Sequence, residues 1–90
     1  MKNRSKTALF SEILELARDG AQKTKIMYNA FLSYSQLKDY LTVLIENGLI
    51  EHQEGGKVYR TTEKGLHFLR MHNQINELIS TNNASMKLKL

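Results

Sequence analysis

Residues 32–51 read LSYSQLKDYLTVLIENGLIE and combine an amphipathic helix with the start of a strand. Ser33 is a typical helix N-cap, and Gly48 stands where a left-handed residue often ends a helix. At about 100° per residue, one side of the helix collects the apolar side chains Leu37, Tyr40, Leu41, Leu44 and Ile45. The stretch therefore predicts a helix over residues 34–47 that packs on a core and presents a polar outer face.

A β-hairpin is predicted directly after this helix. Strand-like segments over residues 49–53 and 58–61 flank Gly55-Gly56, which is among the better two-residue turn signals. With the turn at these glycines, three cross-strand pairs follow: Gln53 with Val58, His52 with Tyr59, and Glu51 with Arg60. The inner face should then hold Ile50, His52 and Tyr59, and the outer face a Glu51–Arg60 ion pair.

The remaining segments predict three more helices. Apolar residues recur at helical spacing over residues 6–19, before Gly20. Thr24 is a candidate cap for a second, shorter helix, and Thr62 for a last helix that ends near Ile79. The final residues, 81–90, are expected to fray.

Three helices, a glycine-tipped hairpin and a closing helix follow one another in the order of a winged helix-turn-helix domain. The predicted fold class is α+β, mainly helical, with a two-stranded wing. In this fold the third helix enters the DNA major groove and the hairpin flanks it. The expected divisions are a basic N-terminal arm (1–5), the winged helix-turn-helix domain (6–62), a C-terminal helix suited to dimerisation (63–80) and a flexible tail (81–90).

Composition limits the class of protein. Ninety residues form one domain, and the absence of cysteine rules out disulfides and thiolate metal sites. No apolar run approaches the length of a membrane span, and the N-terminus lacks a signal-peptide pattern, so we expect a cytoplasmic, nucleoid-associated protein. The net charge is +4, and the first 25 residues carry six Lys or Arg against three Asp or Glu. Such an excess suits a polyanionic partner.

Two runs of sequence carry a family resemblance. Residues 24–51, TKIMYNAFLSYSQLKDYLTVLIENGLIE, and residues 54–65, EGGKVYRTTEKG, resemble the small archaeal winged-helix family typified by the ten-kilodalton DNA-binding proteins of Sulfolobus chromatin. The matching residues are Thr24, Ile26, Met27, Tyr28, Leu32, Ser33, Tyr34, Tyr40, Leu44, Gly48, Leu49, Ile50, Thr62 and Gly65. The resemblance, over roughly residues 6–70, implies a DNA-binding winged helix that dimerises through a long last helix as an antiparallel coiled coil. Here the last helix is predicted to be shorter, and Thr81-Asn82-Asn83 interrupts the seam.

The outer face of the third helix supplies the candidates for base reading: Ser35, Gln36, Lys38, Asp39 and Thr42. Their hydrogen-bonding groups can meet base edges. However, the helix holds Lys38 against Asp39 and Glu46, a net charge of −1. Base reading is therefore expected to be weak, and most of the attraction to DNA should come from neighbouring segments.

Basic residues around this helix are the candidates for phosphate contact. They come from the arm, the entry to the second helix, the wing and the start of the last helix: Lys2, Arg4, Lys6, Lys23, Lys25, Lys57, Arg60 and Lys64, with Tyr34 beside them. For each lysine alone, a solvated surface position is an equal alternative. Tyrosines at the spacing of Tyr28 and Tyr34 are more often core residues.

The last helix carries a heptad-like seam with spacings of three, four and three residues: Phe68, Met71, Ile75 and Leu78. Leu66 and Leu69 lie beside this seam and can pack on the domain. We predict a homodimer through the seam. The alternative is that the stripe folds back onto its own domain.

The sequence is compatible with three classes of function. The first is a protein that binds double-stranded DNA, as a transcriptional regulator or an architectural chromatin protein, and the second is a winged-helix module for protein–protein contact. The third, an enzyme, is the least expected, because no nucleophile–base set and no phosphate loop is visible. His67 and His72 are five residues apart, a spacing that does not put both on one helix face, so no metal site is predicted. No cofactor, small-molecule substrate or membrane partner is expected.

Overall fold

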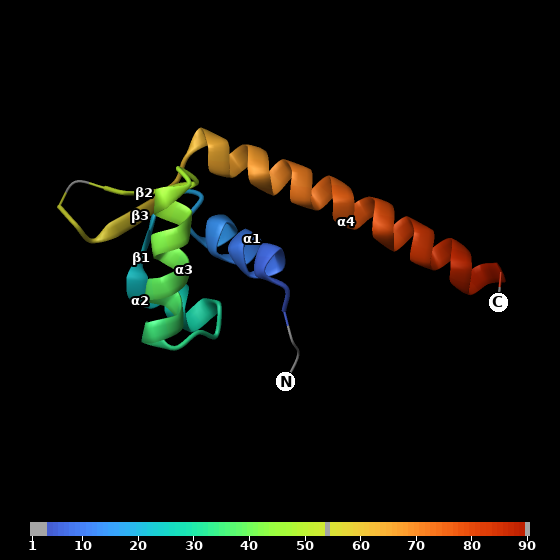
Figure 1. Cartoon of the computed structure of the whole chain (residues 1–90), viewed down its shortest axis with the longest axis horizontal. Coiled ribbons are helices and arrows are strands. Elements are labelled where there is room, and N and C mark those ends of the chain that lie inside the picture. Colours follow the sequence, from blue (N-terminus) through green and yellow to red (C-terminus); the bar gives the residue numbers. More distant parts are fainter. Residues whose placement is uncertain (1–3, 54, 90) are drawn as a thin grey trace.

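The core of the computed structural model is formed by aliphatic side chains that converge from the helices and the sheet. The structure describes residues 4–53 and 55–89, with side chains described up to residue 79. In chain order the elements are α1 (Lys6–Leu16), β1 (Ala21–Gln22), α2 (Lys23–Asn29), α3 (Tyr34–Glu46), β2 (Ile50–His52), β3 (Val58–Thr61) and α4 (Glu63–Lys89). Figure 1 shows α1, α2 and α3 gathered on one side, the β2–β3 hairpin projecting as the wing, and α4 extending past α1. The winged helix-turn-helix prediction is confirmed.

The sheet has three antiparallel strands in the order β1-β3-β2. The predicted hairpin register is confirmed, because His52 pairs with Tyr59 and Glu51 with Arg60. The prediction of a two-stranded wing was incomplete, since β1 adds to the other edge of β3 through Ala21 and Tyr59. A strand of two residues is too short to show an alternating pattern, so β1 could not be predicted from the sequence.

Side chains from α1, α2, α3, β2 and α4 fill the centre of the core. The largest fully buried ones are Ile13, Leu14, Ile26, Leu37, Leu44, Ile50 and Leu69. The predicted apolar face of α3 is confirmed at Leu37, Leu41 and Leu44, and Tyr40 packs edge-on against Phe10 with ring centroids 5.8 Å apart. Ile45 is exposed, so its assignment to that face was wrong.

The ends of α3 follow the sequence signals closely. The Ser33 side chain accepts a hydrogen bond from the Gln36 backbone N–H at 3.1 Å, and the Gln36 side chain accepts one from the Ser33 N–H at 3.0 Å. This reciprocal capping box fixes where the helix begins. Thr62 caps α4 as predicted, because its hydroxyl oxygen accepts from the Gly65 N–H at 3.1 Å. Thr24 is not a cap, since α2 already begins at Lys23.

Helices α2 and α3 end in the same motif with different residues. Phe31 follows α2 with φ = 57°, and Gly48 follows α3 with φ = 73°. In each case the backbone N–H of the following residue closes the motif. The Leu32 N–H donates to the Met27 carbonyl at 3.0 Å, and the Leu49 N–H donates to the Leu44 carbonyl at 2.9 Å. The left-handed conformation costs a residue with a side chain about 1–2 kcal/mol, which glycine avoids.

Helix α4 does not end near Ile79, because it continues as helix to Lys89. The predicted flexible tail is thus helical as far as Lys89, and the final residue lies outside the described residues. Alanine, methionine, lysine and leucine beyond Asn83 are good helix formers, which explains the extension. The 27 residues of α4 span about 40 Å at 1.5 Å per residue. In the described part of the chain, no helix combines the length and the apolar character needed to cross a bilayer.

Candidate nucleic-acid interface

The outer face of α3 is polar and open to solvent. All five base-reading candidates are exposed: Ser35, Gln36, Lys38, Asp39 and Thr42. Two of them also make local hydrogen bonds. The Gln36 carbonyl oxygen is used in the capping box, and the Thr42 hydroxyl donates to the Lys38 carbonyl at 2.9 Å. An external partner would therefore meet the Gln36 amide nitrogen as a donor and the Thr42 oxygen as an acceptor.

A cleft of about 210 Å³ lies between α2 and the wing. Lys23 and Thr24 line it from α2, and Gly56 and Lys57 line it from the wing. Two phosphate candidates that are far apart in the sequence thus share one cleft. The pairing of Gln22 with Val58 between β1 and β3 holds the two sides together. The sequence could not reveal this cleft, because β1 was not predicted.

The first residue of α3 joins this cleft. The Lys23 ammonium lies 5.0 Å from the centroid of the Tyr34 ring, within the range of a cation–π contact. Tyr34 and Tyr28 are 55% and 73% exposed. The expectation that tyrosines at these positions are core residues was therefore wrong. Phe31, which no sequence pattern indicated as a surface residue, is exposed as well.

Three further candidates for phosphate contact, Lys25, Lys6 and Arg60, lie outside the cleft between α2 and the wing. Lys25 on α2 is exposed. Lys6, at the start of α1, lines a groove with Gln36 and Asp39 of α3 and so lies beside the reading face. Arg60 is half-buried, and its guanidinium lies beside Gly20. A methyl group added at Gly20 would lie 3.4 Å from the Arg60 Nη2 atom.

The other basic candidates are engaged within the protein or lie outside the described residues. Arg4 donates to Glu12 at 2.6 Å, and the Lys64 ammonium donates to the Asn47 carbonyl at 2.8 Å. Lys2 lies outside the described residues. In the described chain the ion pairs are Arg4–Glu12 and Arg18–Glu15, so the predicted Glu51–Arg60 pair does not form.

The wing itself is stiffened by an aromatic stack. The His52 ring lies parallel to the Tyr59 ring with centroids 4.2 Å apart, and its Nε2 atom is 2.7 Å from the Gly56 carbonyl oxygen. Tyr59 is buried as predicted, whereas His52 is exposed rather than inward. In the described part of the chain, no three His, Cys, Asp or Glu side chains are grouped so that they could hold a metal ion.

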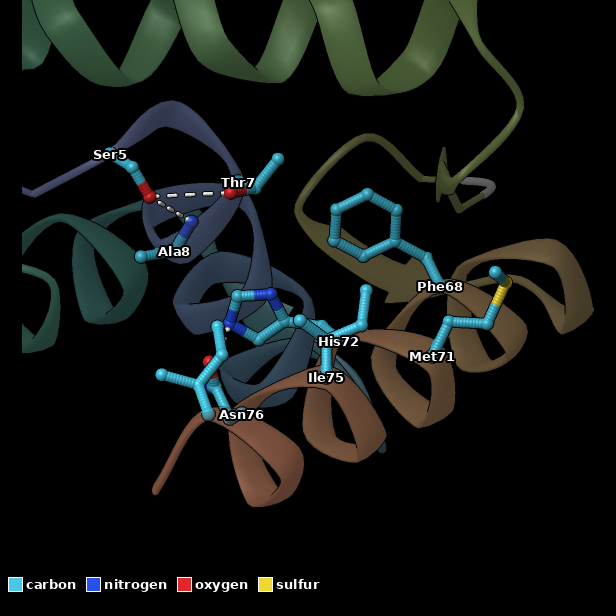
Figure 2. Close-up of a pocket in the computed structure, with 9 residues that line it drawn as sticks. Ser5, Thr7, Ala8, Phe68, Met71, His72, Ile75 and Asn76 are labelled. Carbon is cyan, nitrogen blue, oxygen red and sulfur yellow. Dashed lines mark hydrogen bonds between the residues drawn. The ribbon is translucent and has the colours of Figure 1, made fainter. Parts of the chain in front are cut away.

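The predicted dimer seam on α4 is divided between the domain and solvent. Phe68 packs partly against the core, whereas Met71, Ile75 and Leu78 are exposed. Leu69, beside the seam, is buried and Leu66 partly so. A hollow of about 440 Å³ lies between α4 and the start of α1. Figure 2 shows the apolar side chains of α4 facing Ser5, Thr7 and Ala8 across it.

A family model described as winged helix-turn-helix matches residues 3–80. The chain is similar to Sso10a-2, a DNA-binding protein from Sulfolobus solfataricus, with a TM-score of 0.73 and 27% identity over 96% of this chain and 92% of that one. It is also similar in fold to Lactococcus lactis ZitR, with a TM-score of 0.69 and 20% identity over 99% of this chain and 62% of that one.

A comparison with curated protein sequences gave no match. The resemblance to the Sulfolobus proteins that the sequence motifs indicated is confirmed by the likeness to Sso10a-2. Because the winged helix-turn-helix model covers residues 3–80, the chain belongs to the winged helix-turn-helix family.

Proposed function

We propose that this protein binds double-stranded DNA with α3 in the major groove and with basic residues of α2 and the wing on the phosphates. The observation that carries the proposal is the cleft in which Lys23 of α2 and Lys57 of the wing meet beside the first residue of α3. Phosphate contacts of this kind fix a protein on the duplex without reading sequence. The net charge of +4 and the likeness to a DNA-binding protein of Sulfolobus support it.

We propose further that sequence selectivity is low, as in an architectural protein rather than an operator-specific regulator. Asp39 and Glu46 outnumber Lys38 on α3, and a carboxylate near the duplex repels phosphates. Gln36 and Thr42 already use part of their hydrogen-bonding capacity within α3. Discrimination between bases depends on such groups, whereas general affinity depends on the lysines.

One experiment tests duplex binding against the alternative of a protein-contact module. Fluorescence anisotropy would measure the affinity of the Lys25→Ala, Lys57→Ala, Arg60→Ala triple variant for random-sequence duplex at a stated salt concentration. We expect weaker binding to every sequence and a salt slope less steep by about 2.7 for each protomer on the duplex, at about 0.9 for each lost contact. The matched control is Arg70→Ala, an exposed position on α4. A wild-type protein that binds no duplex would refute the DNA-binding proposal.

A second experiment addresses selectivity. Selection of preferred sites from a random pool, followed by measurement of their affinity against random duplex, separates an architectural protein from a regulator. Specific regulators bind their sites at least about 1,000-fold more tightly than other sequences. We expect a flat profile, with no site preferred by more than about 10-fold. A strongly preferred site would instead indicate a regulator.

We also propose a homodimer through α4. Met71, Ile75 and Leu78 are exposed on a helix that extends past the domain. Met71 and Ile75 also border the apolar hollow beside α1 (Figure 2). Exposed apolar side chains at heptad spacing suit pairing with a second copy. Sedimentation at micromolar concentration should give a species twice the chain mass, and Ile75→Glu should return it to the monomer. A monomer alone in the wild type would overturn the dimer.

A further inference from the structure

The turn between α2 and α3 exposes three aromatic side chains within seven residues. Tyr28 in the last turn of α2 is 73% exposed, Phe31 in the connection 79%, and Tyr34 at the start of α3 55%. We call these three residues the aromatic turn. It lies at the N-terminal end of α3. The chain enters the wing from the opposite end of that helix (Figure 1), and the wing borders α2 at the cleft that Lys23 and Lys57 line. Aromatic side chains this large are normally buried, so the cluster suggests a binding surface.

The backbone of Phe31 points to the same conclusion. Phe31 adopts φ = 57° in a helix-ending motif that the same chain forms with Gly48 after α3. Glycine would end α2 without this strain, and Phe31 gains little from burial because most of its side chain is exposed. A strained and exposed residue is best explained by an external contact of its side chain.

The charge around the aromatic turn indicates the kind of partner. Residues 20–38 include Lys23, Lys25 and Lys38 and no aspartate or glutamate. The Lys23 ammonium lies over the Tyr34 ring, which brings a positive charge next to an aromatic face. Lysines interleaved with exposed aromatic rings are typical of surfaces that bind single-stranded nucleic acid, where the rings stack on bases and the lysines contact phosphates.

Stacking on a base requires a base face that is free. In a duplex, bases cover one another's faces and present only their edges in the grooves. An unpaired strand leaves these faces open, and stacking tolerates any base because every base has a π-face. The aromatic turn is therefore better matched to unpaired bases than to a closed duplex.

We propose that the aromatic turn binds single-stranded DNA, with Phe31 and its tyrosine neighbours stacking on bases and Lys23 and Lys25 contacting phosphates. This activity goes beyond the duplex binding proposed above, because it adds the exposed rings of Tyr28 and Phe31 to the Lys23–Tyr34 contact that borders the basic cleft. A duplex in that cleft and an adjacent unpaired segment on the aromatic turn could then be held side by side.

The test uses the full chain and an oligothymidine of about 15 nucleotides, within the site sizes known for single-strand binding folds. Phe31→Gly removes the ring and relieves the left-handed backbone, so the midpoint of thermal unfolding should rise while affinity for the oligothymidine falls about 10-fold or more. Phe31→Tyr keeps a stacking ring and should retain the affinity within about two-fold. Ile45→Ala, an exposed apolar position near the other end of α3, is the matched control and should not change it.

Binding to a closed hairpin duplex, measured in parallel, separates this proposal from duplex recognition. Phe31→Gly should leave the duplex affinity nearly unchanged. If wild type binds the duplex but not the oligothymidine, or if Phe31→Gly binds the oligothymidine as well as wild type, the single-strand proposal is wrong and duplex binding stands. If wild type binds the oligothymidine in a Phe31-dependent way but no duplex, the proposal for the aromatic turn holds and that for α3 and the wing fails.

Discussion

The Thr61 hydroxyl donates a 2.6 Å hydrogen bond to the backbone carbonyl of Leu14 and so ties the wing to the first helix. The Thr61 backbone N–H also donates to the Ala17 carbonyl at 3.0 Å. Both carbonyls lie at the C-terminal end of α1, where the last helical carbonyls lack partners within the helix. Thr61 is buried, so these bonds form away from solvent and fix where β3, and with it Lys57 and Arg60, lies relative to the helices.

Thr61→Val should therefore destabilise the whole domain. Valine preserves the shape of the side chain but leaves the Leu14 carbonyl without its hydroxyl donor, which costs about 1–3 kcal/mol when the group is buried. Urea unfolding followed by circular dichroism would measure the loss. Thr24→Val is the control, because Thr24 is exposed on α2 and such surface changes stay within about 0.5 kcal/mol. Equal stability of the two variants would contradict this role for Thr61.

Gly65→Ala should also be severely destabilising. Gly65 lies in the first turn of α4, where an added methyl group would collide with the backbone carbonyl of Leu49, at the start of the wing. The backbone of β2 cannot move without disturbing the sheet, so overpacking should cost about 1–3 kcal/mol or more. Thermal unfolding would measure it, with His67→Ala as an exposed control on the same helix. A melting temperature close to that of the control would contradict the predicted clash.

The fold could be predicted because the helix caps and the hairpin turn are determined by residues that lie close together in the sequence. Ser33 and Gln36 form a capping box three residues apart, and Gly55-Gly56 sets the register that pairs His52 with Tyr59. Each signal reflects a hydrogen bond or turn geometry that needs no knowledge of the tertiary structure. The order of elements then identified the winged helix-turn-helix domain.

The candidate site was less predictable because it depends on contacts between distant segments. The cleft that joins Lys23 to Lys57 needs β1, and two residues carry no strand pattern. Arg4 and Glu12 are eight residues apart, which is not the three- or four-residue spacing at which ion pairs form along a helix, so this pair could not be predicted. Phe31 shows another limit, because no local pattern indicates that this residue ends α2 with a left-handed backbone and an exposed side chain.

Single substitutions of Lys57 and Arg4 should show which of the two side chains contacts phosphates when DNA binds. Lys57 is exposed on the wing, whereas the Arg4 guanidinium is held by Glu12 at 2.6 Å. Lys57→Ala should therefore reduce the salt slope of duplex binding by about 0.9 for each bound protomer, and Arg4→Ala should reduce it by much less. Anisotropy titrations at several salt concentrations would measure both slopes. A larger effect from Arg4→Ala would mean that Glu12 releases it when DNA binds.

The salt dependence of the wild type should report both the number of phosphate contacts and the number of protomers on one duplex. Setting aside Lys2, Arg4 and Lys64, five basic candidates remain for each protomer: Lys6, Lys23, Lys25, Lys57 and Arg60. At about 0.9 for each contact, one bound protomer gives a slope of log affinity against log salt of about −4.5.

A dimer joined through α4 that places both protomers on one duplex should double this slope to about −9, and Ile75→Glu should return it to the single-protomer value. The comparison is informative because the substitution lies on α4, away from the basic cleft, so that any change in slope reflects the loss of the second protomer. A wild-type slope that Ile75→Glu leaves unchanged would mean that only one protomer contacts each duplex. A slope near zero for the wild type would instead rule out phosphate contact as the source of affinity.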